Sequence, residues 1–309
     1  MARLTARTAY GAAMRFLRSV NPYPSRRFDG RGVVICAGGP VYLPCAWVCI
    51  NMLRRVGCRL PIEVWARDGK ELDPTIRRLL KPLGVRCVNA ESVQRKFPTN
   101  VRGGWELKPF SILHSRFREV LFLDADNVPV ADPTRLFDAP EYQNTGAVFW
   151  PGPMPLPEHN PMWALCRVPY RKEPEFETGQ MLINKARCWK PLQLTMHMNE
   201  HSDFYYKLVH GDKDTFHFAW HMVGQEFTMV SRPMVWLDGA WAAWQHGLNG
   251  RLLFQHRNMA KWELYGPNPM VAGFYFEEEC FEYLFDLRRR WNGQGRDASA
   301  NRFRFNVLQ

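Results

Sequence analysis

The apolar run at residues 120–123 ends in two acidic residues, Asp124 and Asp126. A run bounded in this way is typical of a buried strand. Residues two apart in an extended chain point to the same side, so we expect both carboxylates to converge where the chain leaves the sheet. Buried carboxylates repel one another unless a positive group lies between them, and a divalent cation carrying a diphosphate meets that need. The pair therefore predicts a metal site for a phosphorylated ligand, although the same spacing also occurs where an aspartate only caps a turn.

Strand and helix patterns alternate around this run. Apolar runs predict strands, and helical periodicity predicts helices between them, at residues 32–37, 43–56, 62–66, 74–81, 85–88, 109–117 and 120–123. This alternation predicts an α/β fold with a mostly parallel sheet, helices on both faces and a ligand site beyond the carboxyl ends of the strands. Further strands at 147–150 and 176–185, with helices at 189–198 and 214–223, predict an elaborated C-terminal half. No G-x-G-x-x-G follows the first strand, which disfavours dinucleotide binding.

The 309 residues are enough for one large α/β domain, and no internal repeat or low-complexity linker divides them. We expect a basic N-terminal leader or helix at residues 1–31, a single domain at 32–270, and a C-terminal helix with a basic tail at 271–309. Residues 2–20 are patterned as a basic amphipathic helix, and a helix of this kind either lies on anionic lipid or docks at the chain end. Its apolar side carries Leu4, Tyr10, Met14 and Leu17.

The formal net charge of +11 suits an anionic partner. Basic residues are dense at both ends of the chain, but no nucleic-acid-binding motif accompanies them, so we expect no nucleic-acid partner. The eight cysteines form no C-x-x-C pair, and most lie in apolar runs typical of buried free thiols. The N-terminus offers no apolar stretch long enough for a signal peptide or a membrane span. These features favour the cytoplasm, with peripheral contact to the inner membrane face through the basic N-terminus.

Several short motifs occur in the order seen in retaining glycosyltransferases of the GT-A type. They are Leu107-Lys108-Pro109, Phe122-Leu123-Asp124-Ala125-Asp126, Glu177-Thr178-Gly179-Gln180, Gly211-Asp212-Lys213-Asp214-Thr215-Phe216, and His256 with Lys261-Trp262. The chain most resembles the α-mannosyltransferase family of the fungal Golgi and its bacterial relatives, and more distantly the glycogenin-type transferases. The resemblance covers about residues 33–262. It implies a GT-A, Rossmann-like fold and metal-dependent, retaining transfer of a hexose, with GDP-mannose as donor, Mn²⁺ or Mg²⁺ as metal, and an oligosaccharide or glycolipid as acceptor.

The resemblance also implies roles for the metal ligands. Asp124 contacts the donor's ribose side and the metal, Asp126 binds the metal directly, and His256 is the third protein ligand, where an imidazole favours Mn²⁺ over Mg²⁺. Glycogenin-type enzymes place their lysine one residue further from the histidine and follow it with Pro-Trp. An ordinary packed role for His256, or a role of nearby His246 in its place, therefore stays open.

Further roles follow for cations and carboxylates. Lys108 and Lys261 neutralise the diphosphate, unless they are ordinary solvated lysines. Glu177 faces the donor sugar and Asp212 lies near the reacting carbon, where a carboxylate either favours an oxocarbenium-like transition state or acts as a transient nucleophile. Asp214 either shares this catalytic role or caps a helix that begins at Thr215. The candidates for contact with the base or ribose are Ala37, Gly38 and Asp68, although an acid beside a glycine turn often serves only the turn.

Three other readings compete. A glycogenin-like transferase would use a UDP-sugar. Haloacid-dehalogenase-type phosphohydrolases also end a strand in D-x-D, but usually on the first strand and before a small hydroxyl residue, whereas three strands precede Asp124 here and Asn127 follows its partner. A basic, aromatic-rich module for nucleic acid or acidic glycan would stack bases or sugars on its rings. The polar residues found here converge on carboxylates instead, which disfavours such a module.

Overall fold

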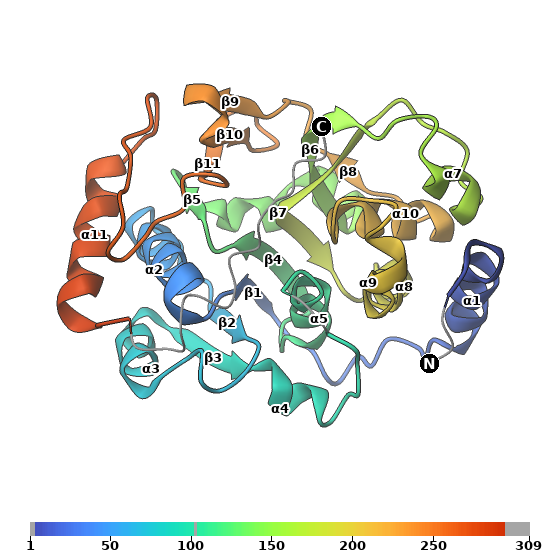
Figure 1. Ribbon diagram of the computed structural model, residues 1–309, viewed down its shortest axis with the longest axis horizontal. Coiled ribbons are helices and arrows are strands. Elements are labelled where there is room, and N and C mark those ends of the chain that lie inside the picture. The colour runs from blue at the N-terminus through green and yellow to red at the C-terminus, as the bar shows by residue number, and fades with distance from the viewer. Residues whose placement is uncertain (1–3, 102–103, 294–309) are drawn as a thin grey trace.

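The computed structural model describes residues 4–101 and 104–293. At its centre lies a seven-stranded sheet in the order β3-β2-β1-β4-β7-β6-β8 (Figure 1). These strands are β1 (Arg31–Cys36), β2 (Ile62–Ala66), β3 (Val85–Asn89), β4 (Glu119–Asp124), β6 (Ala147–Pro155), β7 (Pro174–Asn184) and β8 (Thr228–Met229). Strands β1 to β4 pair in parallel, and β7 is antiparallel to both of its neighbours. The predicted mostly parallel α/β sheet is confirmed.

Helices cover both faces of this sheet. The α-helices are α1 (Ala6–Ser19), α2 (Gly39–Arg55), α3 (Pro74–Leu80), α4 (Ala90–Gln94), α5 (Leu107–His114), α6 (Pro140–Thr145), α7 (Pro161–Cys166), α8 (Trp189–Glu200), α9 (Ser202–Tyr205), α10 (Lys213–Val223) and α11 (Glu277–Arg290). Short 3₁₀ helices occur at η1 (Lys81–Leu83), η2 (Pro133–Asp138) and η3 (Asp238–Ala240). Helix α2 starts four residues before the predicted position, because Pro40 fits its first turn and Pro44 is accommodated inside it.

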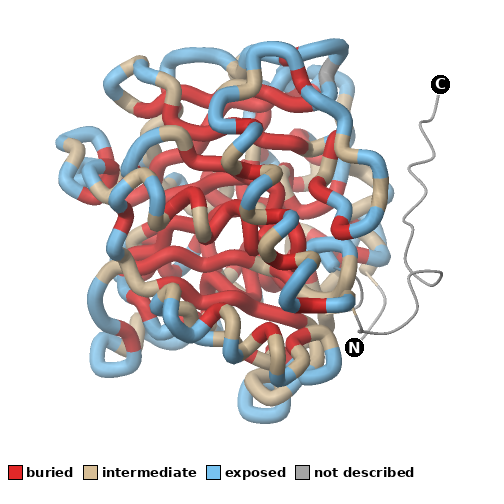
Figure 2. Tube along the Cα trace, turned by 90° about the vertical axis from the view of Figure 1, so that its left-hand side faces the viewer, coloured by how far each residue is buried: buried red, intermediate tan, exposed pale blue. Residues whose placement is uncertain are grey.

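The two-residue period of the strands divides the core into two layers. In β4, Leu121 and Leu123 belong to the core beneath α2, whereas Val120 and Phe122 belong to the core beneath α5, α8 and α10. Figure 2 shows the strands as a continuous buried centre, with exposed backbone confined to the periphery. Strands buried on both faces read as uninterrupted apolar runs, which explains why the sequence pattern located them.

A second, four-stranded sheet was not expected. Its order is β5 (Asn127–Pro129), β11 (Leu252–His256), β10 (Ala242–His246) and β9 (Val235–Leu237), and all pairs are antiparallel. The register of β5 and β11 places His256 opposite Asn127. The backbone N–H of Arg257 also donates to the carbonyl oxygen of Asp126 at 3.0 Å. This sheet therefore carries a late part of the chain to the carboxyl end of β4.

Both terminal helices pack on the central fold. Helix α1 contacts α7 and α8, with Ala9 and Ala13 buried, and Leu4 and Leu17 pack against the same core. Of the two alternatives expected for this helix, docking on protein is observed for these four residues, and contact of the helix with lipid stays a prediction. Helix α11 packs on α2, while residues 294–309 of the predicted C-terminal helix and basic tail lie outside the described residues. The domain division at residues 31 and 270 stays a prediction.

Two further observations concern the chain as a whole. All eight cysteines are free thiols. Among residues 4–101 and 104–293, no helix combines the length and apolarity needed to cross a membrane.

Candidate active site

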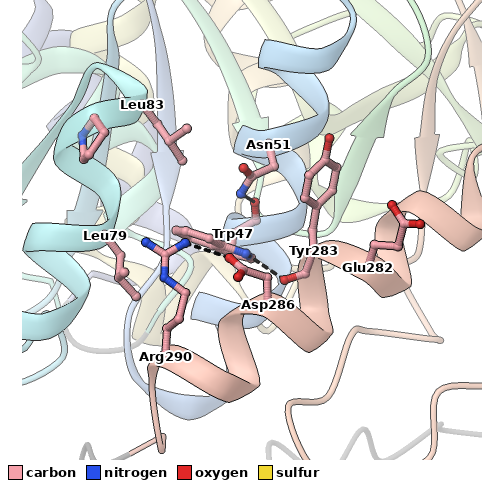
Figure 3. Close-up of a pocket in the computed structure, with 9 residues that line it drawn as sticks. Trp47, Asn51, Leu79, Leu83, Glu282, Tyr283, Asp286 and Arg290 are labelled. Carbon is pink, nitrogen blue, oxygen red and sulfur yellow. Dashed lines mark hydrogen bonds and ion pairs between the residues drawn. The ribbon is translucent and has the colours of Figure 1, made fainter.

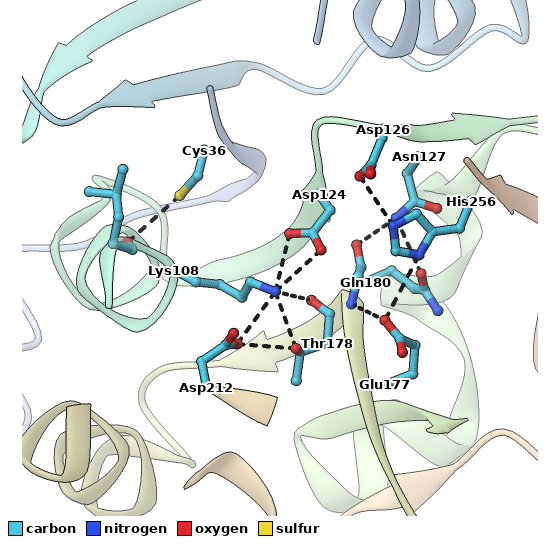
Figure 4. A network of polar contacts seen from close by, with 12 residues as sticks. Cys36, Lys108, Asp124, Asp126, Asn127, Glu177, Thr178, Gln180, Asp212 and His256 are labelled. Carbon is cyan, nitrogen blue, oxygen red and sulfur yellow. Dashed lines mark hydrogen bonds and ion pairs between the residues drawn. The ribbon is translucent and has the colours of Figure 1, made fainter. Parts of the chain in front are cut away.

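The candidate site lies beyond the carboxyl end of β4. Strand β1 ends beside β4 in a register that places Cys36 opposite Asp124. The chain then turns through Ala125 and Asp126 and enters β5 in the second sheet. Polar side chains from α5, β7 and β11 converge on this turn (Figure 4). The site thus sits at the sheet edge predicted from the order of strands.

Lys108 is the centre of the network around Asp124. It lies in the first turn of α5 and is 8% exposed. Its Nζ lies 3.2 Å from Asp124 Oδ1 and 3.4 Å from Asp212 Oδ2, and it donates to Thr178 Oγ1 at 3.2 Å. The Thr178 hydroxyl in turn donates to Asp212 Oδ2 at 3.1 Å. One ammonium therefore holds two predicted site carboxylates in place, which rules out a freely solvated Lys108.

Asp126 has a separate set of partners. His256 Nε2 lies 3.1 Å from its Oδ1, and Lys261 donates to its Oδ2. Lys261 is anchored as well, because its Nζ donates to the carbonyl oxygen of Asn258 at 2.8 Å. His256, and not His246, is the histidine that reaches the acidic pair.

The acidic pair and His256 form a candidate metal site. Asp124, Asp126 and His256 each offer one ligand atom, and these three atoms lie within 4.8 Å of one another. Two carboxylates and one imidazole suit Mn²⁺ better than Mg²⁺, which prefers oxygen ligands. The residues present therefore fit a divalent cation.

Burial disfavours the charged form of the ionisable side chains at this site. The neighbouring charges decide whether the pKa of each side chain ends above or below its usual value. Burial raises the pKa of Asp126, but Lys261 and His256 outweigh it and hold that pKa well below its usual range. Burial likewise raises the pKa of Asp124, and here Lys108 only partly compensates, so the pKa stays above its usual value. For Lys108, burial lowers the pKa, but the nearby carboxylates raise it above its ordinary value. Lys108 thus compensates Asp124 in part, and Lys261 with His256 compensates Asp126, a pairing that the sequence did not reveal.

Gly179 makes the approach of His256 possible. A Cβ atom on Gly179 would lie 2.7 Å from His256 Cε1 and 2.9 Å from Glu177 Oε1, closer than real Cβ atoms come. The backbone N–H of Gly179 also donates to Glu177 Oε1 at 2.8 Å, which turns the Glu177 carboxylate toward the histidine. The Nδ1 atom of His256 lies 3.9 Å from that oxygen.

Sequence reasoning missed two polar residues of this network. Thr178 links Lys108 to Asp212, and Asn127 donates from Nδ2 to the carbonyl oxygen of Gly179 at 2.6 Å. Thr178 directly follows Glu177, and Asn127 directly follows Asp126. Adjacency to a predicted site residue was therefore the one feature of the sequence that could have identified them.

Four predicted residues lie outside this network. Asp214 is 1% exposed, and its Oδ2 accepts the backbone N–H of His210 at 3.2 Å. It does not cap α10, because that helix begins at Lys213 and Asp212 occupies the N-cap position. Its predicted catalytic role stays a prediction.

The other three lie near the ends of β1 and β2. Asp68 accepts the backbone N–H groups of Lys70 and Glu71 at 2.7 and 3.2 Å, so its carboxylate serves its own turn. Ala37 and Gly38 lead from β1 into α2, and the Glu71 side chain packs against Gly38. Their contact with a base or ribose stays a prediction.

A pocket of about 360 Å³ lies elsewhere, between α2, η1 and α11 (Figure 3). Trp47 and Arg290 line it, and the Trp47 indole donates to the carbonyl oxygen of Tyr283 at 2.8 Å. It contains none of the predicted site residues. The polar cluster beyond β4 is therefore the candidate active site.

The fold is that of GT-A glycosyltransferases. A solved structure of an active-site mutant of LgtC aligns with a TM-score of 0.53 at 14% identity, covering 84% of this chain and 100% of that one. The glycosyltransferase GlyE of Streptococcus pneumoniae aligns with a TM-score of 0.50 at 14% identity, covering 85% of this chain and 64% of that one. At these identities the likeness shows the fold alone.

The family follows from sequence. The mannosyltransferase family profile Mannosyl_trans3 matches residues 30–164 and 158–243, and the chain belongs to this family. The α-1,2-mannosyltransferase MNN21 of Candida albicans is 28% identical over 271 residues, which cover 69% of this chain and 40% of that protein. The chain thus spans less than half the length of this relative. The predicted resemblance to the fungal mannosyltransferases is confirmed, and the phosphohydrolase reading is set aside.

Proposed function

We propose that this protein transfers a mannosyl residue from GDP-mannose to a glycan acceptor, with retention of the α configuration and with Mn²⁺ as the preferred metal. The observation that carries the proposal is the cluster of Asp124, Asp126 and His256, whose ligand atoms lie within 4.8 Å of one another beyond β4. Membership of a mannosyltransferase family supports the transferred sugar. The fungal relatives are named α-1,2-mannosyltransferases, which supports an α-1,2 linkage. An oligosaccharide or glycolipid is the acceptor that we propose.

The residues at this site have different roles in the proposed reaction. A divalent cation, when bound, stabilises the charge that develops on the departing diphosphate. Lys261 pairs with Asp126 here, and a diphosphate offers this ammonium a second anionic partner. Lys108 and Thr178 fix the Asp212 carboxylate, while the Gly179 N–H fixes that of Glu177. Asp212 and Glu177 are therefore the oriented carboxylates available to an oxocarbenium-like centre or to a covalent intermediate.

The donor and the metal are tested together by thermal shift. A ligand that binds only the native state raises the Tm. We expect GDP and GDP-mannose to raise the Tm only with Mn²⁺, and we expect Asp126→Asn to lose this effect. Asp29→Asn is the matched control, because Asp29 is exposed and precedes β1, at the end of that strand away from the site. Stabilisation by UDP-sugars alone would favour the glycogenin-like alternative, and stabilisation by nucleotide without metal would contradict the proposal.

Stereochemistry and linkage are tested on the product. With GDP-mannose and a mannoside acceptor, we expect an α-linked product by NMR that an α-1,2-specific mannosidase hydrolyses. A β-linked product would contradict retention, whereas an α-linked product resistant to that mannosidase would contradict only the linkage.

Membrane association is a separate proposal. Arg7, Arg15 and Arg18 on α1 are exposed, and basic side chains attract anionic headgroups. We propose peripheral contact with a cytoplasmic membrane face through these arginines, without insertion of the apolar side of α1. The protein should cosediment with phosphatidylserine vesicles at low salt and dissociate at high salt, and substitution of all three arginines by glutamine should abolish cosedimentation. We expect no nucleic-acid partner.

A further inference from the structure

A second cluster of metal-binding side chains lies outside the site beyond β4. It consists of Glu173, His217 and His221, whose ligand atoms lie within 4.8 Å of one another. Glu173 immediately precedes β7, and both histidines stand on α10, which packs against β7 (Figure 1). None of these residues belongs to the motifs that define the transferase.

The two imidazoles converge on one carboxylate oxygen. His217 Nε2 lies 2.9 Å from Glu173 Oε1, and His221 Nε2 lies 2.5 Å from the same atom. Histidines four residues apart share one face of a helix, and this spacing places two ring nitrogens on one metal ion in known zinc sites. The geometry therefore offers two nitrogens and one oxygen within one coordination shell.

The surroundings hold these side chains in place. The His217 ring is fully buried and stacks on Phe176 with ring centroids 4.8 Å apart, and the edge of Trp163 also contacts it. The side chain of His221 is 8% exposed, whereas that of Glu173 is 27% exposed. The histidines are thus pre-oriented, and the glutamate leaves a route from solvent to the cluster.

We infer that Glu173, His217 and His221 bind one Zn²⁺ ion. Zinc accepts imidazole and carboxylate together, and three protein ligands leave one position of a tetrahedral site for water. The ion would join α10, whose N-cap is Asp212, to the entrance of β7, which carries Glu177 and Thr178. The ion would thus link two elements that position active-site residues, and its existence does not depend on the proposed transferase activity.

The test counts bound zinc. The metal-free 309-residue chain is titrated with ZnCl₂ against a chromophoric chelator, and the number of ions per chain is compared among variants. We expect His221→Gln and Glu173→Gln each to bind one ion fewer than the wild type, or to bind it at least about tenfold more weakly, since even second-shell changes cost this much. Both amides can still form hydrogen bonds, which favours folding. His159→Gln is the control, because His159 is exposed and outside the cluster.

Two readouts decide the inference. Zn²⁺ should raise the Tm of the wild type and of His159→Gln more than that of His221→Gln or Glu173→Gln. An unchanged zinc count and Tm response in both cluster variants would overturn the inference. If circular dichroism shows that one variant fails to fold, the other decides. Loss of the Mn²⁺-dependent GDP effect in Asp126→Asn tests the active site separately, so the two proposals can fail independently.

Discussion

His256 Nε2 lies 3.1 Å from Asp126 Oδ1 because β11 pairs with β5 in a register that places His256 opposite Asn127. The second sheet thereby brings an imidazole nitrogen to the acidic pair at the end of β4. We expect His256→Gln to weaken Mn²⁺ binding in the presence of GDP by about 10–100-fold, a loss typical even of groups that only support a metal ligand. Isothermal titration measures the affinity.

The control for this prediction is His246→Gln. His246 stands on the neighbouring strand β10 but is not among the clustered ligands. An equal loss of Mn²⁺ affinity in both variants would contradict the assignment of His256.

Lys108 compensates two carboxylates, the partly exposed Asp124 and the buried Asp212. We expect Lys108→Met to lower the free energy of unfolding by about 3–5 kcal/mol, because removing one member of a buried ion pair leaves the other charge unpaired. Urea denaturation at neutral pH measures this change. Lys70→Met is the control, because Lys70 is exposed and its substitution should change stability little. A similarly small change in both variants would show that Lys108 does not stabilise the fold through these ion pairs.

Gly179 leaves room for the His256 ring. In Gly179→Ala, the added Cβ would lie 2.7 Å from His256 Cε1, and the histidine must move away from Asp126. We expect loss of the Mn²⁺-dependent GDP shift and a decrease of about 1–3 kcal/mol in stability, as is usual for overpacking. Gly104→Ala is the control, since nothing lies within 4 Å of its added Cβ. Normal metal binding by Gly179→Ala would refute this account.

The raised pKa of Asp214 leads us to expect that the stability of the protein depends on pH. Burial raises its pKa to about 7, although Lys213 acts against this shift. The unfolded carboxyl, with a pKa of about 4, loses its proton first, so the native state is penalised progressively as the pH rises from about 4 through 7. The penalty reaches at most about 4 kcal/mol above pH 8.

Asp214→Asn removes this ionisation. We therefore expect the variant to gain stability over the wild type between pH 5 and pH 8, measured as the difference in Tm. A Tm difference that is the same at both pH values would exclude a raised pKa for Asp214.

The strands were predictable because both of their faces are buried. Residues 62–66 form β2 as predicted, and residues 120–123 lie within β4. The run at 120–123 is uninterruptedly apolar, whereas the run at 62–66 contains one charged residue, Glu63, which is buried and pairs with Arg86. Their alternation with helices predicted a parallel sheet and placed Asp124 at the carboxyl ends of its strands. The local sequence therefore carried most of the central fold.

The pairing of β5 with β11 was not predictable in this way. Strand β5 has three residues, and its partner lies far along the chain, so no periodicity links the two. For the same reason the contacts of Lys261 with Asp126, and of Thr178 with Lys108, came only from the structure. The motif resemblance named several of these residues, but it could not reveal which acid each cation compensates.

The late position of His256 and Lys261 has a consequence for biosynthesis. A nascent chain that has emerged only as far as β10 already contains the whole central sheet and both acids, yet it lacks the imidazole and the ammonium that contact Asp126. The proposed metal site, which includes His256, is therefore complete only after most of residues 1–309 have been synthesised.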